Sequence, residues 1–344
     1  MRALVDRAGT DSHGRLSKVQ IRRIKKGDLA KVREVVEHAF GDFFERHMGT
    51  RPRQVFGGAQ YVHHRWLMEP WGCFVAEEDG SKIVGAALAA TWGTVGLVGP
   101  VAVLTNYQNQ SVGQQLIRAV DEFFAENRTA LQGVVTYPTS PKHLYLYHRL
   151  GYKPKSLQLV MSRATERRPI VPSDNGKAPK APLVTRRYSS LEEAKKKAIL
   201  ARLHRMTNAI CRGLDLSKEI EIVDGLALGD TVLLERGRDV LGFAVYHTPG
   251  VSEAPQGTLY VKFLAIDPAQ KRVEHFQHLV RAIEDLALDL GLSRVIMPVY
   301  LRYWQAYSTL VACGYQVDSS MVRMQRGRQE DYEDPMHLVL DDWR

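Results

Sequence analysis

The alternation of apolar and polar positions along the 344-residue chain predicts strands and helices. The runs KIVGAALAAT (82–91) and VGLVGPVAVL (95–104) are short, apolar and bounded by turn residues, which is typical of buried strands. In residues 111–127, apolar residues from Val112 to Phe124 recur at helical spacing and form one stripe. The pattern therefore predicts an α/β fold of the α+β type, with a mixed, mostly antiparallel sheet flanked by helices.

The predicted elements follow a similar order in both halves of the chain. Strands are predicted at 19–24, 73–78, 82–91, 95–104, 131–137 and 156–163, and then at 231–237, 240–247, 258–266, 294–300 and 320–326. Helices are predicted at 28–44, 55–68, 111–127, 141–150, 272–290 and 302–312. Asp28 is the predicted N-cap of the first helix, because its carboxylate can accept from free N–H groups there.

The second half repeats the first. A shift of 163 positions places Leu150-Gly151-Tyr152 on Cys313-Gly314-Tyr315, and the apolar pattern then stays in phase. Upstream, Ile83 matches Val240 instead, so a connection differs in length. We therefore predict two tandem domains of one fold, at 18–163 and 184–344. Residues 164–183 have the proline-rich composition of a linker, and residues 1–17 are predicted to be disordered.

Composition and charge narrow the class of protein. The chain is 44% hydrophobic and 25% charged, which is ordinary for a soluble protein. Three separated cysteines and a polar N-terminus predict a cytoplasmic protein with no disulfide framework, no cysteine-bound zinc and no signal peptide. No charge occurs between Ile83 and Ile117, but Gly93 and Pro100 break this stretch, which favours buried strands over a membrane span.

The net charge of +9 is concentrated in residues 15–31 and 163–180. Such stretches attract anions, although a solvated tail and linker explain them equally well. Because no aromatic-interleaved basic motif accompanies them, we expect no nucleic-acid partner and no membrane partner.

The segment 101–117 combines a buried strand, a short uncharged loop and a helix beginning near Ser111. The first N–H groups of a helix lack partners and form an anion site. Ser111 and Gly113 are small enough to let a phosphate approach the backbone. A plain strand-to-helix turn would look similar, so this loop alone does not establish a site.

Two motifs resemble those of the GCN5-related N-acetyltransferases (GNAT family). Gln108-Asn109-Gln110-Ser111-Val112-Gly113 is similar to the acetyl-CoA loop Q/R-x-x-G-x-G/A, with Ser111 in place of a glycine. Leu146-Tyr147-His148-Arg149-Leu150-Gly151-Tyr152 is similar to the family's Leu-Tyr-x-x-x-Gly-Phe/Tyr motif. The resemblance covers residues 19–162 well and 184–325 loosely.

The resemblance implies direct transfer of an acetyl group from acetyl-CoA to a primary amine. It implies that the segments 98–104 and 131–137 splay apart around the pantetheine chain, which backbone groups of Val101 and Val103 would hold. Tyr147 would be the general acid that protonates the departing thiolate. The pyrophosphate would be bound by Gln108, Asn109, Gln110, Ser111, Val112 and Gly113.

The sequence does not identify the general base. The strand 95–104 contains no carboxylate, so a water chain also stays possible. The candidate side chains are Glu77, Glu78, His63, His64 and His143. His63 and His64 are not expected to bind a metal together, because adjacent helical residues point apart.

The second copy departs from the first where the chemistry would require identity. Ser111, Gly113 and Tyr147 correspond to Glu274, Phe276 and Leu310, and Tyr303 and Tyr307 lie in other phases of that helix. We therefore predict a degenerate, non-catalytic second domain that completes the acceptor site, acts as a built-in dimer partner or binds a regulator.

The leading hypothesis is a cytoplasmic tandem N-acetyltransferase with acetyl-CoA as cosubstrate and no metal. A small-molecule amine is a more probable acceptor than a protein, and the enzyme would be a monomer or homodimer. The alternatives are a non-catalytic acyl-CoA-binding sensor or an aminoacyl-tRNA-dependent transferase. The long helical hairpin of such transferases is absent from the sequence.

Overall fold

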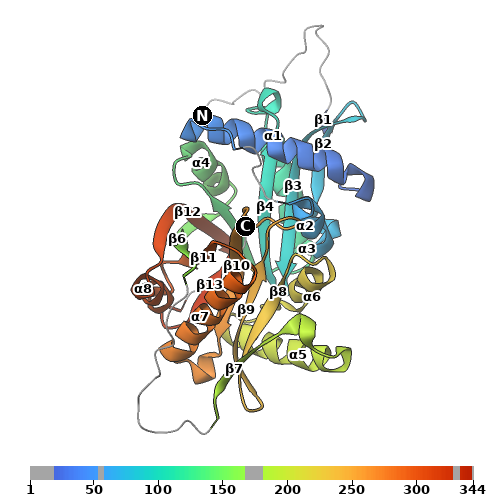
Figure 1. Ribbon diagram of the computed structural model, residues 1–344. Helices are drawn as coiled ribbons and strands as arrows, with labels where there is room; N and C mark the ends of the chain where they lie inside the picture. The colour runs from blue at the N-terminus through green and yellow to red at the C-terminus, as the bar shows by residue number, and fades with distance from the viewer. Residues whose placement is uncertain (1–18, 53–57, 167–180, 328–333, 343–344) are drawn as a thin grey trace.

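The computed structural model describes residues 19–52, 58–166, 181–327 and 334–342 (Figure 1). The predicted disordered stretch 1–17, the start of the predicted helix 55–68 and most of the predicted linker 164–183 lie outside the described residues.

The first copy has the predicted order of elements. Its strands are β1 (Val19–Arg23), β2 (Phe74–Glu78), β3 (Lys82–Trp92), β4 (Val95–Val103), β5 (Leu131–Thr136) and β6 (Lys153–Ala164). Its α-helices are α1 (Leu29–Met48), α2 (Tyr61–Met68), α3 (Val112–Glu126) and α4 (Pro141–Arg149). Asp28 precedes α1 but does not cap it through its side chain. Its carboxylate instead accepts hydrogen bonds from the Lys25 backbone and the Arg22 guanidinium, so Asp28 stands at the predicted N-cap position without capping the helix through its side chain.

The second copy repeats this order. Its strands are β7 (Leu183–Arg187), β8 (Gly229–Arg236), β9 (Asp239–His247), β10 (Thr258–Ile266), β11 (Arg294–Tyr300) and β12 (Gln316–Gly327). Its α-helices are α5 (Glu193–Ile210), α6 (Ser217–Gly225), α7 (Val273–Asp289) and α8 (Trp304–Ala312). A last strand, β13 (Val339–Asp341), has no counterpart among the first-copy strands. The sequence analysis did not predict β7, α5, α6 or β13.

The bounds of corresponding elements in the two copies show the repeat. β4, α4 and β6 begin at Val95, Pro141 and Lys153, and β10, α8 and β12 begin at Thr258, Trp304 and Gln316. Each pair has the shift of 163 positions seen in the sequence. The two halves therefore share one pattern of elements.

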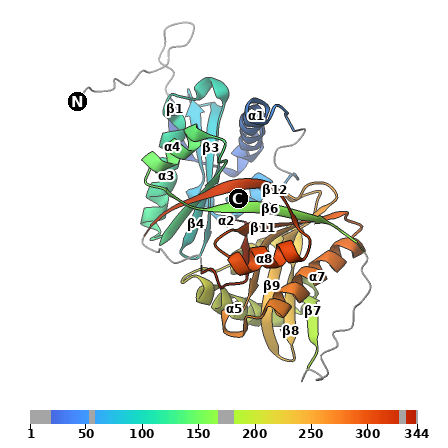
Figure 2. The same cartoon turned by 90° about the vertical axis from the view of Figure 1, so that its left-hand side faces the viewer.

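The two copies exchange their last strands. The sheet runs in the order β1-β2-β3-β4-β5-β12-β6-β11-β10-β9-β8-β7, so β6 of the first copy pairs with β11 and β12 of the second copy pairs with β5. Figure 2 shows β12 and β6 side by side across the middle of the molecule. The paired strands are antiparallel except for β4–β5 and β10–β11, which confirms the predicted mostly antiparallel sheet. The exchange makes the sheet continuous, so packing joins the two copies.

Helices cover both faces of the first-copy sheet. Along β3, Ile83, Ala86 and Leu88 pack into the core beneath α1 and α2, whereas Val84 and Ala87 pack beneath α3. The predicted apolar stripe of α3, from Val112 to Phe124, is buried in the second of these cores. Within the part of the chain that the structure describes, no helix has the length and apolarity needed to cross a membrane.

Candidate functional site

A cavity of about 390 Å³ lies where β4 and β5 separate. The two strands pair in parallel at Val95–Leu97 and Leu131–Gly133, and their pairing ends there. Beyond that point, residues from Val98 to Val103 and from Val134 to Tyr137 border the cavity. The separation agrees with the arrangement that the family resemblance implies.

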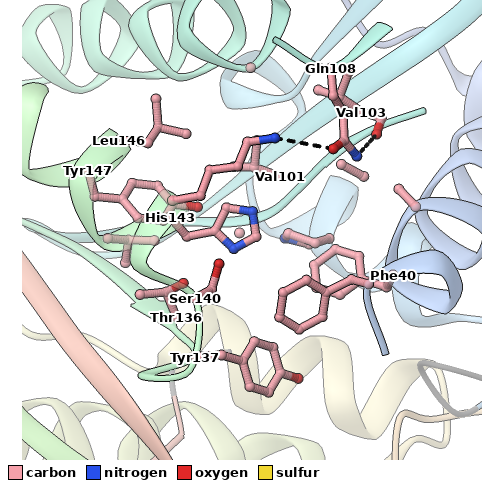
Figure 3. Close-up of a pocket in the computed structure, with 18 of the residues that line it drawn as sticks. Phe40, Val101, Val103, Gln108, Thr136, Tyr137, Ser140, His143, Leu146 and Tyr147 are labelled. Carbon is pink, nitrogen blue, oxygen red and sulfur yellow. Dashed lines mark hydrogen bonds between the residues drawn. The ribbon is translucent and has the colours of Figure 1, made fainter. Parts of the chain in front are cut away.

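The backbone of β4 presents polar groups to this cavity. The Leu104 N–H donates to Val84 O on β3 at 2.9 Å. Since backbone groups alternate along a strand, those of Val101 and Val103 point away from β3 toward β5. The Val103 carbonyl accepts from Gln108 Nε2 at 3.0 Å, and Lys142 Nζ donates to Gln108 Oε1 at 3.3 Å (Figure 3). Gln108 and Lys142 thus close one end of the strand gap.

The loop before α3 has a backbone geometry that suits an anion. Asn109 and Ser111 have φ angles of 63° and 62°, in the left-handed region. α3 begins directly after Ser111, and no acidic residue lies in its first turn. A Cβ built on Gly113 would meet Val103 Cγ2 at 3.7 Å, which is ordinary van der Waals contact. The first N–H groups of α3 therefore face a space bordered by small side chains, with the helix dipole favouring an anion.

The left-handed φ of Ser111 explains why the family pattern has glycine at this position. A residue with a Cβ costs about 1–2 kcal/mol in this conformation, whereas glycine adopts it freely. The departure noted in the sequence is therefore a strained position, and the loop keeps its geometry despite it.

Replacing this serine should stabilise the protein. We expect Ser111→Gly to raise the free energy of unfolding by up to about 1 kcal/mol, because relief of strain exceeds the entropic cost of glycine. Chemical denaturation measures the change. Ser140→Gly is the matched control, since Ser140 precedes α4 with a φ of −113° and should lose stability. Equal losses in both variants would contradict the strain argument.

Most of the predicted cosubstrate-binding residues border the cavity. These are Val101, Val103, Gln108, Asn109, Ser111, Val112 and Gly113. Gln110 does not, because its side chain is directed back to Asn106 O, to which Nε2 donates at 3.0 Å. The sequence analysis missed Lys142, Arg46 and Arg149, which add positive charge to the cavity wall. Two of these three cations could have been suspected from their place in or beside the Leu-Tyr-x-x-x-Gly-Tyr helix.

Tyr147 borders the same cavity and is 7% exposed. Burial raises the pKa of its phenol well above the usual value, so the hydroxyl keeps its proton at neutral pH. Tyr145 lies two residues earlier on α4 and is 63% exposed. Tyr145 also borders the cavity, but its ring is mostly exposed to solvent whereas that of Tyr147 is buried.

Four of the five predicted side-chain candidates for the general base lie away from the cavity. Glu77 is bound by Arg22, and Glu78 accepts a hydrogen bond from Tyr107. His63 contacts Gln60, and His64 faces Glu219. None of these four candidates is among the residues that border the cavity.

His143 is the base candidate that borders the cavity. Burial lowers its pKa to about 4, with smaller contributions from Lys142 and His47, so the imidazole is neutral at physiological pH. Asp42 is the only carboxylate among the described residues around the cavity. Thr105 and Arg51 both donate to it, which holds the pKa of Asp42 below its usual value.

Aromatic rings surround the imidazole. The ring centroid of Phe43 lies 5.4 Å from that of His143, 5.0 Å from Tyr137 and 4.4 Å from His47. In Figure 3 His143 points into the cavity between Tyr147 and Phe40. α1 supplies Phe40 and Phe43, which the sequence analysis missed because an aromatic residue on an amphipathic helix looks like core.

The equivalent gap of the second copy is filled by the chain itself. β10 and β11 pair only at Thr258–Tyr260 and Arg294–Ile296, and β13 then pairs with β10. Ile266, the counterpart of Val103, donates its N–H to Leu338 O. Backbone groups that face the cavity in the first copy are thus bonded to β13 in the second.

The helix ends of the second copy also differ from those of the first. Glu274 lies in the first turn of α7, where its charge opposes an anion. Phe276 and Leu310 are fully buried in the core rather than beside a cavity.

Comparisons with known proteins agree with this geometry. A family model described as an acetyltransferase (GNAT) domain matches residues 69–154. No curated protein matches the sequence.

Solved structures of similar fold cover nearly the whole chain. A GCN5-related N-acetyltransferase from Sphaerobacter thermophilus is 13% identical, with a TM-score of 0.59 over 91% of this chain and 96% of that one. A tandem GNAT protein of the clavulanic acid biosynthesis pathway is 8% identical, with a TM-score of 0.55 over 91% and 99%. A GCN5-related glucosamine N-acetyltransferase region of a fungal GH3 β-N-acetylglucosaminidase is 13% identical, with a TM-score of 0.65 over 90% and 38%. The domain match thus identifies a GNAT acetyltransferase domain in residues 69–154, and the structural likenesses show that the chain has the fold of tandem two-domain GNAT proteins.

Proposed function

We propose that the chain is an acetyl-CoA-dependent N-acetyltransferase whose first copy performs the reaction on a primary amine. The observation that carries the proposal is the contrast between the two strand gaps. The β4–β5 gap opens onto a cavity that ends at the free N–H groups of α3, whereas β13 fills the β10–β11 gap. A pantetheine chain can add to β4 through Val101 and Val103, with its pyrophosphate at the residues from Gln108 to Gly113.

The reaction moves one acetyl group and one proton. The acceptor nitrogen attacks the thioester carbonyl carbon, the C–S bond breaks, and the nitrogen loses a proton. Tyr147 donates a hydrogen bond to the departing sulfur, which stabilises the developing thiolate. Because its pKa is raised, the Tyr147 hydroxyl keeps its proton and acts as a hydrogen-bond donor rather than as a general acid. The thiolate is then protonated by solvent after release.

His143 is the proposed group that receives the proton of the amine. It is neutral above pH about 4, so its free ring nitrogen is available across the physiological range. An imidazole of such low pKa is a weak base, however, and an alkylammonium has a pKa near ~10. We therefore propose that the amine reaches the site already neutral and that His143 takes the proton after attack, when the nitrogen is more acidic.

The cavity favours a small acceptor. Its volume of about 390 Å³ must accommodate the acetyl-CoA arm as well as the acceptor, and Phe40, Phe43 and Tyr137 give it an aromatic wall. We propose a small-molecule amine with an apolar portion as the acceptor, rather than a protein. No nucleic acid or membrane is part of this proposal.

Removing the imidazole should lower turnover without preventing binding. We expect His143→Gln to reduce kcat by about 100-fold. The pH profile of kcat/KM should keep its shape, because His143 is neutral throughout the range and the acid limb belongs to the amine. His47→Gln is the matched control, since His47 also borders the cavity and its ring contacts Phe43. Equal kcat values for the two variants would exclude His143 as the proton acceptor.

The decisive experiment is an acceptor screen. The protein is incubated with acetyl-CoA and a broad panel of primary amines, and free thiol release is measured. We expect at least one small apolar amine to release thiol in proportion to its acetylation. Tight acetyl-CoA binding without turnover on any amine would instead identify an acyl-CoA sensor.

A further inference from the structure

A buried cluster joins the two copies at a distance from the acetyl-transfer cavity. It consists of His64 on α2, Glu219 on α6 and His247 on β9, which are 2%, 4% and 1% exposed. One nitrogen or oxygen atom from each residue lies within 4.8 Å of the other two. α2 belongs to the first copy and packs on α6 of the second, so the cluster lies at their junction.

The nitrogens of this cluster lack hydrogen-bond partners among the described residues. His64 Nε2 is 2.9 Å from Glu219 Oε1, yet their alignment is not that of a hydrogen bond. Both ring nitrogens of His247 are buried and make no hydrogen bond. His64 Nε2 and His247 Nδ1 each still have a carboxylate oxygen within 3.5 Å, whereas His247 Nε2 has no partner among the described residues. Because buried polar atoms are nearly always satisfied, this nitrogen indicates a missing ligand.

Neighbouring side chains orient the ligand atoms. Trp92 Nε1 donates to Glu219 Oε2 at 3.1 Å, which leaves Oε1 facing His64. Glu253 Oε1 lies 3.5 Å from His247 Nδ1. A carboxylate beside one ring nitrogen directs the other nitrogen of a histidine toward a metal. The two ligands from the second copy thus have the outer contacts that metal sites require.

The charges around the cluster also suit a cation. Glu219 and Asp342 are buried with Arg65 and Lys262, and the Glu253 side chain is 11% exposed. Lys262 Nζ lies 2.7 Å from Glu253 and 2.8 Å from Asp342. Three carboxylates against two cations leave one negative charge when both histidines are neutral.

We propose that His64, Glu219 and His247 bind one divalent cation, with Zn²⁺ as the best fit, which holds the two copies together. Two imidazoles and one carboxylate form a common zinc donor set, and a water molecule can complete the tetrahedron. The ligands must separate slightly, because 2.9 Å is shorter than the ~3.3 Å between ligands of a tetrahedral site with bonds of ~2.0 Å. None of the three residues borders the acetyl-transfer cavity, so the ion has a structural role.

Metal binding by the full-length protein tests this proposal. We expect about one zinc ion per chain by elemental analysis after purification. After removal of metal with a chelator, Co²⁺ should produce the intense visible bands of a four-coordinate site, and Zn²⁺ should displace it. Zn²⁺ should also raise the thermal midpoint of the stripped protein, because it binds the folded state.

Substitutions locate the site. Glu219→Gln keeps an acceptor for Trp92 and should weaken Co²⁺ binding by at least ~100-fold, whereas Glu253→Gln should weaken it by ~10-fold through His247. His63→Gln, next to His64 and outside the cluster, should bind as the wild type does. Circular dichroism and the thermal midpoint of the stripped proteins show whether each variant folds, and His247→Gln replaces any that does not. Absence of Co²⁺ bands in the wild type, or equal affinity in Glu219→Gln, would overturn the proposal and leave a hydrogen-bonded or hydrated cluster.

Discussion

Gly113→Phe should abolish acetyl-CoA binding while leaving the protein folded. Gly113 is the second residue of α3 and borders the cavity, so a phenyl ring there must enter the space proposed for the pyrophosphate. Loss of two charge-assisted hydrogen bonds at roughly 1.5–3 kcal/mol each lowers affinity by more than ~100-fold. Calorimetry should show one site per wild-type chain and none in the variant, and acetyl-CoA should no longer raise the thermal midpoint.

Gly113→Ala is the control that distinguishes the effect of a large side chain from the effect of replacing glycine at all. The added Cβ would lie 3.7 Å from Val103 Cγ2, an ordinary contact, and Gly113 does not need a left-handed φ. We expect this control to bind acetyl-CoA within a few-fold of the wild type. If Gly113→Phe is stabilised by acetyl-CoA as the wild type is, the cosubstrate binds elsewhere. A second calorimetric site would mean that β13 leaves the β10–β11 gap.

Tyr147→Phe should lower kcat by ~100-fold or more. The phenol is buried beside the cavity and its raised pKa keeps the proton in place, so its removal leaves the departing sulfur without a donor. Acetyl-CoA affinity should change little, because Tyr147 contributes through the transition state. Stopped assays of thiol release over a range of acetyl-CoA concentrations give kcat and KM separately.

Tyr145→Phe provides the control for this prediction. Tyr145 lies on the same helix and is 63% exposed, so it should keep wild-type turnover. Unchanged kcat in Tyr147→Phe would remove Tyr147 from the mechanism. A loss of turnover that occurs equally in both variants would point to a general effect on α4.

Local sequence signals predicted most elements around the site. The alternating pattern located β3 and β4, and the apolar stripe located α3. The Leu-Tyr-x-x-x-Gly-Tyr motif placed α4 at Pro141–Arg149. Each of these signals lies within a contiguous stretch of residues, where periodicity and turn residues indicate the local secondary structure directly. The left-handed Ser111 was not predicted, because serine rarely adopts that conformation.

Contacts between distant segments were not predictable in this way. His143 was one base candidate among several, and the arrangement of α1 against α4 brings it to Phe43. The sequence analysis set His64 aside as a metal ligand because it compared it only with His63. The proposed partners, Glu219 and His247, are more than 150 positions away.

The chain's local pattern was sufficient to predict the repeat, the order of elements in the first copy and the strand-loop-helix turn before α3. Tertiary structure alone decided which strand lies beside which. A buried strand carries the same apolar pattern whichever neighbour completes its hydrogen bonds, so the exchange of β6 and β12 leaves no local mark. For the same reason β13 was not predicted. In the second copy β13 bonds to the backbone groups of β10, whereas the equivalent groups of the first copy face a cavity. The proposed difference in function between two similar halves therefore rests on one short strand and the residues that face each gap.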